Sequence, residues 1–312
     1  MVDSRDPHPL TRLPPAAARL GRAVGRPLPI AIACLVALAA LGWVYLMLMV
    51  ADSVARGDAA ALGPGMGVFD LLSRGGGPDL LGRALLDALC RPRFGAPSPG
   101  AAATAGALVL MMWGAMTLAM MLPTAAGMVA TYAQIADTAA RKSEPAVSPL
   151  VLTGGYVAVW LGFAALATVL QITLTRLALL DPAMGVASPL FAGAIFVGAG
   201  GYQFTALKHA CLARCQRPFP FFFANWTTTP SGVFRLGARQ GLDCLGCCWA
   251  TMLVMFAVGV MNVVWMAGLG ALMTAEKLAT TPRLSRVMGI VFLAIGAALI
   301  ARSVAAHWPG AA

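Results

Sequence analysis

Charged side chains are scarce in this sequence. Asp, Glu, Lys and Arg make up 11% of the 312 residues, whereas about a quarter of the residues of soluble domains are charged. The hydrophobic fraction is 59% and the mean hydropathy is +0.79. This composition excludes an ordinary soluble domain and indicates an integral membrane protein. Familiar catalytic patterns are missing too, because the chain has no Ser-His-Asp set, P-loop, Gly-rich dinucleotide turn or HExxH sequence. No familiar catalytic constellation is therefore visible, which favours a protein other than an enzyme.

Long apolar runs predict an all-α polytopic bundle of about six transmembrane helices. A helix needs roughly 20 apolar residues to cross the hydrocarbon of a bilayer, and several runs reach that length. Helices rather than a β-barrel are expected, because runs this long satisfy their backbone hydrogen bonds internally. The expected spans cover residues 28–50, 103–133, 150–175, 189–210, 246–273 and 286–306.

The runs divide the chain into four expected regions. Residues 1–27 form a basic cytoplasmic tail, and residues 28–50 the first transmembrane helix. Residues 51–102 form an external loop, in which charges alternate with leucines over residues 79–89, as in a short amphipathic helix at the membrane interface. Residues 103–312 form the metal-binding transmembrane core considered below.

The net charge of +10 is better explained by membrane topology than by binding to nucleic acid, because the basic residues are spread over the connections. Basic residues before a first span favour its retention with the N-terminus in the cytoplasm. We therefore expect a multi-pass protein of the bacterial inner (plasma) membrane with a cytoplasmic N-terminus. The basic residues before the first run are Arg5, Arg12, Arg19, Arg22 and Arg26.

Five of the seven cysteines lie in two clusters on either side of one connection. Cys211 and Cys215 end the fourth run, and Cys244, Cys247 and Cys248 begin the fifth. Spacings of three and four residues place side chains on one face of a helix. Two such helices can bring up to five sulfurs together, and soft sulfur ligands select Cu(I), zinc or iron–sulfur clusters. Lys208 and Arg214, close by in sequence, would favour the thiolate forms.

Other interpretations of the cysteines remain open. The clusters could form a redox or structural disulfide, or they could pack inertly, as cysteine often does in apolar surroundings. Isolated Cys34 and Cys90 are expected only to pack. His209 is a weaker ligand candidate, because it precedes Cys211 by two residues and so points roughly 200° away around a helix.

Methionines favour copper over other soft metals. Along the fifth run the cysteine face continues through Met252, Met255, Asn262 and Met266. In the second run Met112, Met116 and Met120 recur every fourth residue, with Met121 adjacent. Thioethers bind Cu(I) without losing a proton, although methionine also fills gaps in helix bundles and Asn262 could simply bond a neighbouring helix. The residues expected at the metal site are Cys211, Cys215, Cys244, Cys247, Cys248, Met252, Met255, Met120, Asn262 and His209.

Three stretches resemble a bacterial family described as predicted metal-binding integral membrane proteins. They are MMWGAMTLAMMLPT (111–124), YQFTALKHACLARCQRP (202–218) and GLDCLGCCWATMLVMFAVGVMNVVWM (241–266), the last with a CxGCCW motif. The resemblance implies a polytopic inner-membrane protein with copper-chaperone-like relatives that serve copper-dependent oxidases. It marks the five clustered cysteines, Trp249, Met261 and Asn262. Ala206 departs from the pattern, because relatives usually have proline there.

The leading hypothesis is a membrane protein that binds Cu(I) and delivers it to a copper-dependent enzyme such as an oxidase. Its expected partners are the lipid bilayer, the metal ion and that client, and zinc stays open as the metal. One alternative is a thiol-disulfide oxidoreductase that passes electrons from cysteine pairs to a quinone. Another is a zinc-clamped helix bundle that serves as a structural subunit.

Overall fold

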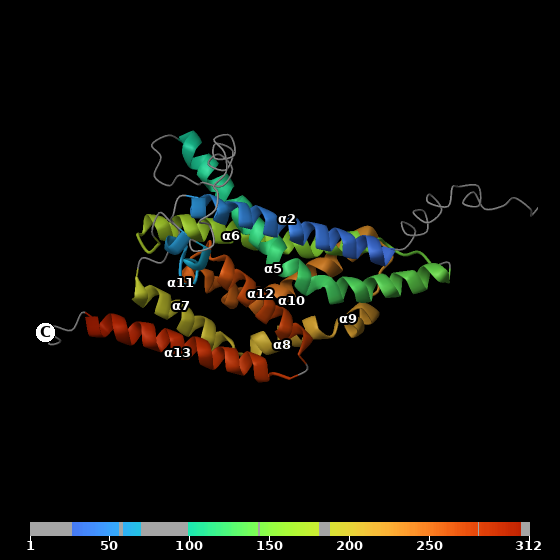
Figure 1. Cartoon of the computed structure of the whole chain (residues 1–312). Coiled ribbons are helices and arrows are strands. Elements are labelled where there is room, and N and C mark those ends of the chain that lie inside the picture. Colours follow the sequence, from blue (N-terminus) through green and yellow to red (C-terminus); the bar gives the residue numbers. More distant parts are fainter. Residues whose placement is uncertain are drawn as a thin grey trace, which may run out of the picture.

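The computed structural model describes residues 27–55, 59–69, 99–142, 144–180, 188–279 and 281–306. Within these residues the chain is all-α (Figure 1). The predicted amphipathic helix at 79–89, the Arg-rich tail and Cys90 lie outside the described residues. The elements are α2 (Pro27–Ala55), η2 (Ala59–Leu62), α5 (Pro99–Arg141), α6 (Pro149–Arg176), α7 (Pro189–Tyr202), α8 (Ala206–Gln216), α9 (Pro218–Ala224), α10 (Pro230–Leu253), α11 (Met255–Val258), α12 (Val263–Leu278) and α13 (Arg283–Ala306).

Helix starts follow local sequence signals. Proline occupies the first turn of α6, α7, α9 and α10, where its missing N–H costs no hydrogen bond. Hydroxyl groups cap several of these helices: the side chain of Ser148 accepts from the backbone of α6, Thr205 from α8 and Thr229 from α10. Each cap satisfies an amide that the first helical turn leaves unpaired.

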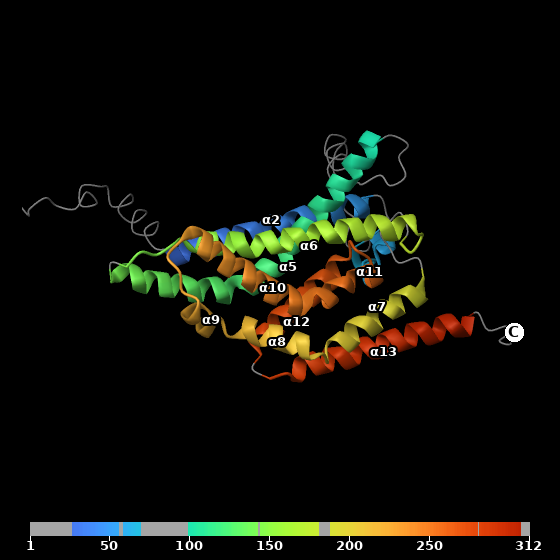
Figure 2. The ribbon, with the colours of Figure 1, turned by 180° about the vertical axis from the view of Figure 1, so that it is seen from behind.

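The helices form a bundle in which α10 and α12 lie between two outer groups. Both views place α2 and α6 on one side and α7 and α13 on the other (Figure 1, Figure 2). Glycines bring some neighbours into backbone contact: a Cβ on Gly155 of α6 would lie 2.0 Å from the carbonyl oxygen of Phe234 on α10, and one on Gly193 of α7 would lie 2.9 Å from that of Gly296 on α13. Small residues of this kind let helices approach closely.

Five helical segments are long and apolar enough to cross a bilayer: residues 28–54, 103–141, 149–176, 230–258 and 283–306. A sixth exists if α7 and α8 count as one span, although they meet at an angle of 64°. The predicted run 189–210 is therefore bent. At the bend Thr205 caps a new helix, with Ala206 at the first helical position.

The predicted fifth span, residues 246–273, is wrong as a single helix. Helix α10 begins earlier, at Pro230, and the helical path continues through α11 to Val258, before a break at residues 259–262 separates it from α12. Gly259 has a φ of +99°, which only glycine adopts easily, and Asn262 caps α12 by accepting from the amide of Trp265. Hydropathy does not reveal these caps and turns, because the residues on both sides of Gly259 and Asn262 are apolar.

The chain after α2 docks into this break. A Cβ on Gly259 would lie 2.2 Å from the carbonyl oxygen of Leu62, and one on Gly63 would lie 2.1 Å from that of Val258. The amide nitrogen of Asn262 donates to the carbonyl oxygen of Pro64 at 2.9 Å. The Gly63-Pro64-Gly65 turn therefore closes the unwound segment instead of only interrupting a loop.

Candidate metal centre

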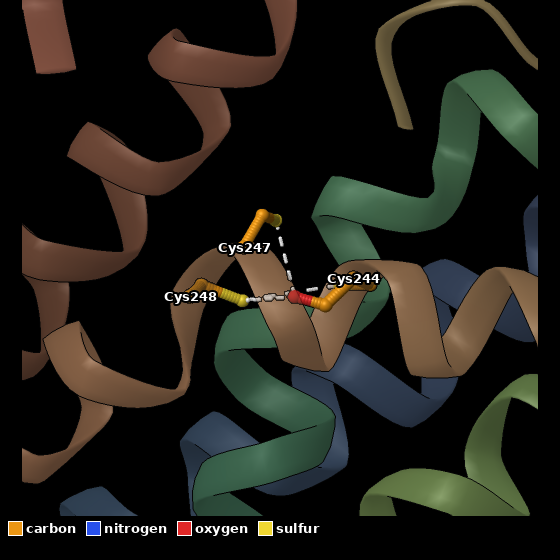
Figure 3. A group of neighbouring side chains, drawn as sticks. All are labelled: Cys244, Cys247 and Cys248. Carbon is orange, nitrogen blue, oxygen red and sulfur yellow. Dashed lines mark hydrogen bonds between the residues drawn. The ribbon is translucent and has the colours of Figure 1, made fainter. Parts of the chain in front are cut away.

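The centre is built around three buried cysteines in the middle of α10. Cys244, Cys247 and Cys248 are exposed by 1–2%, and their sulfurs all lie within 4.8 Å of one another (Figure 3). The Sγ atoms of Cys244 and Cys248 are 3.9 Å apart. The thiols of Cys247 and Cys248 donate to the carbonyl oxygen of Cys244 at 3.1 and 2.8 Å. The sequence predicted these cysteines at the start of a span, but the early start of α10 places them in the interior.

Helix α8 brings the second cysteine cluster to the first. Cys211 lies against Gly246, since a Cβ at that glycine would be 2.6 Å from the Cys211 sulfur. The Cys215 thiol interacts with those of Cys244 and Cys247, but it lies outside the compact group of three. All five thiols are free, and they meet where α8 packs on α10. As a whole residue Cys215 is half-buried, whereas the other four are buried.

Helix α5 contributes a methionine that contacts one of the three cysteines of α10. The Sδ atom of Met121 lies 3.9 Å from the Sγ atom of Cys248, and Met121 is fully buried. Met120, which the sequence predicted as a ligand, instead faces Gly270 of α12. Adjacent helical residues point about 100° apart, so only one of this Met-Met pair can face the cysteines. Which of the two methionines faces the cysteines depends on how α5 packs, and the sequence does not reveal that packing.

Polar groups surround the Cys244 sulfur. The hydroxyl oxygen of Tyr156 lies 3.0 Å from it, and the ammonium of Lys277 donates to it at 2.9 Å. Lys277 also donates to the hydroxyl of Thr124 at 2.6 Å. A buried ammonium needs a counter-charge or several acceptors, and a nearby cation favours the thiolate form of cysteine. The centre therefore contains an electrostatic partner for a negatively charged sulfur.

The cations predicted to lie near the thiols have other partners. Lys208 forms a buried ion pair with Glu276 at 2.9 Å, and Arg214 pairs with Asp243 at 3.1 Å. Glu276 also accepts from Ser285, while the adjacent Lys277 faces Cys244. Neighbouring residues on a helix point in different directions, which explains why these two serve different sites.

The other predicted ligands lie elsewhere on the helices or make structural hydrogen bonds. Met252 lies on α10, four residues after Cys248, and Met255 lies on α11, whereas the break at residues 259–262 separates both from Met266 on α12. Asn262 uses its amide to cap α12 and to bond Pro64 and Val258. His209 is half-buried on α8. In the part of the chain that the structure describes, no histidine or carboxylate joins the three thiols of α10 in one compact group.

Hydrogen bonds between helices hold the centre in place. Tyr202 donates to the carbonyl oxygen of Gly246, and Gln203 donates to the hydroxyl of Thr251 at 3.2 Å. The indole of Trp113 donates to the side chain of Gln171 at 2.7 Å. These bonds connect α5 to α6 and the end of α7 to α10. Tyr156 and Lys277 were missed at the centre, and the only signal for Lys277 was a charge at the end of an apolar run.

Comparison with known families fits this geometry. A model of the PpoB2 family, described as copper chaperone, matches residues 110–299. That is well over half of the chain, from α5 to α13, and it includes every residue of the centre described above. No curated protein and no solved structure matches the chain. The chain belongs to the PpoB2 copper chaperone family.

Proposed function

We propose that this protein captures Cu(I) from the cytoplasmic side of the bacterial plasma membrane and delivers it to a copper-dependent enzyme, such as an oxidase. The observation that carries the proposal is the group of three buried thiols within 4.8 Å, in a chain that belongs to a copper chaperone family. Its apolar helices, long enough to cross a bilayer, support a multi-pass location. Copper here is cargo that the protein passes on.

The surroundings of the thiols support a monovalent soft metal. Thiolates prefer Cu(I) to hard cations, and a copper ion held by two thiolates carries one net negative charge. Lys277, in contact with the Cys244 sulfur, would balance that charge inside an apolar bundle. Half-buried Cys215 would capture the ion first and pass it to Cys244 and Cys247, with which it interacts. Buried Met112 and Met116 on α5 would continue the path.

A zinc clamp is the second candidate, and Cys215 is the observation that favours it. Together with the three thiols of α10 it could supply four sulfur ligands, the number that structural zinc sites use. A zinc clamp would tie α8 to α10 and would release its metal only on unfolding. The two candidates therefore differ in the metal that is bound and in whether the metal can be transferred.

Metal analysis of the purified protein tests the proposal. The full chain is purified in detergent without oxygen, and its copper and zinc are counted by mass spectrometry. We expect copper near one ion per chain in the wild type and none in the variant Cys244→Ser/Cys247→Ser/Cys248→Ser. Cys34→Ser, on α2, is the matched control and should keep its copper. Zinc in place of copper would favour the clamp, and a metal-free wild type with a reducible disulfide would favour a thiol oxidoreductase.

A further inference from the structure

We propose that Met121 is a metal ligand and that its thioether makes the centre selective for Cu(I) over Zn(II). This inference rests on the proposed function, because it assigns a new ligand and a metal preference to the same site. Neither the cysteine motif nor the methionine spacing of α5 indicates it. The observation that supports the proposal is the contact between the sulfurs of Met121 and Cys248, which are 3.9 Å apart.

The position of Met121 is fixed from several sides. Its carbonyl oxygen accepts from the hydroxyl of Tyr156 at 3.1 Å and from that of Thr124 at 2.7 Å. Tyr156 also contacts the Cys244 sulfur, and Thr124 accepts from Lys277. The groups around Cys244 therefore also anchor the backbone that carries Met121. Such outer contacts orient metal ligands and hold them in register.

Pro123 gives α5 a further anchor close to this point. A proline inside a helix cannot donate to the carbonyl four residues before it, and here that carbonyl belongs to Ala119. The indole of Trp43 on α2 donates to the Ala119 oxygen at 3.1 Å. The α5 segment that presents Met121 is thus tied to α2 as well as to α6 and α12.

The chemistry of the thioether accounts for the selectivity. Methionine sulfur is neutral and soft, so it adds a donor for Cu(I) without adding a charge to a buried site. Zinc is held by cysteine, histidine and carboxylates. In the described part of the chain no histidine or carboxylate stands with the three thiols, so the neighbouring donor on the α5 side is a thioether. Cys248 and Met121 together offer a thiol and a thioether, a pair of soft sulfur donors that suits Cu(I) better than Zn(II).

A pair of neighbouring methionines provides the test. Met121→Leu removes the sulfur that contacts Cys248, whereas Met120→Leu, one residue earlier, changes a side chain that packs on Gly270. The affinities of the full chain for Cu(I) and for Zn(II) are measured without oxygen in detergent, by competition with a coloured chelator of each ion. Met121→Gln, which keeps the length of the side chain but not its sulfur, serves as a second variant if leucine disturbs folding.

We expect both Met121 variants to bind Cu(I) at least about tenfold more weakly, since even changes outside the ligand set cost about 10–100-fold. Zn(II) affinity should stay unchanged, and Met120→Leu should resemble the wild type for both ions. Unchanged Cu(I) affinity in the Met121 variants, or an equal loss for both ions, would overturn the proposal while leaving the proposed function intact. A wild type that binds no Cu(I) would instead refute the proposed function, and this inference with it.

Discussion

The sulfur of Cys244 touches groups from four helices. On α10 itself it lies 3.9 Å from the Cys248 sulfur, and Cys215 approaches from α8. Tyr156 of α6 and Lys277 of α12 complete its surroundings. Sequence spacing predicted which cysteines share a face, because the period of a helix fixes that relation. It could not identify Lys277 or Met121, because their approach to the thiols depends on how α12 and α5 pack.

Removing the charge of Lys277 should weaken metal binding. Lys277→Met deletes the ammonium that contacts Cys244 while keeping an unbranched side chain. We expect the affinity for Cu(I) to fall by about 10–100-fold, the usual cost of losing a group that orients and balances a ligand. Competition with a Cu(I) chelator measures the change. Lys277→Arg retains the charge and should lose less affinity for Cu(I). Equal losses of affinity in the two variants would argue against a role for the charge.

Continuous hydropathy predicts some helices of this protein well and misses the breaks in others. The runs at 28–50, 150–175 and 286–306 match α2, α6 and α13 to within a few residues, because continuous hydropathy marks such helices well. The fourth and fifth runs fail at Thr205, Gly259 and Asn262, which are caps and turn residues inside apolar sequence. The cost of burying the Asn262 amide is offset by its hydrogen bonds, such as that to Pro64, and hydropathy does not detect them.

Close packing between α6 and α10 can be tested with two glycines of α6. A Cβ on Gly155 would lie 2.0 Å from the carbonyl oxygen of Phe234, whereas one on Gly162 would meet nothing within 4 Å. Gly155→Ala should destabilise the fold by about 1–3 kcal/mol through overpacking. Gly162→Ala should be neutral or stabilising by about 0.5–1 kcal/mol. Thermal unfolding in detergent compares them, and equal midpoints would contradict the packing described here.

The buried ion pair of Lys208 and Glu276 joins α8 to α12. Ser285 of α13 also donates a hydrogen bond to Glu276. Lys208→Met leaves the Glu276 carboxylate buried without its cation, which should cost about 3–5 kcal/mol. Adding Glu276→Gln removes the isolated charge, so the double variant should unfold at a higher temperature than Lys208→Met alone. Thermal unfolding of the two variants decides this. A double variant that is less stable than the single one would show that the pair is not coupled as the contacts imply.

The whole molecule presents the surface expected of a membrane bundle. Large apolar side chains such as Val36 on α2, Leu166 on α6 and Ile290 on α13 are more than half exposed, and the helices that carry them are candidate spans. The composition alone predicted this class, because 59% hydrophobic residues cannot all be buried in a chain of this size. The orientation across the membrane stays a prediction, since the arginines that favour it lie outside the described residues.

X-ray absorption at the copper edge tests the central claim most directly. The full chain is loaded with one equivalent of Cu(I) without oxygen, and the atoms bound to the metal are identified from the scattering. We predict Cu(I) with sulfur as the only neighbour in its first shell, and no retained copper when Cys244, Cys247 and Cys248 are replaced by serine. A first shell dominated by nitrogen or oxygen, or copper retained by the serine variant, would contradict a thiol centre on α10.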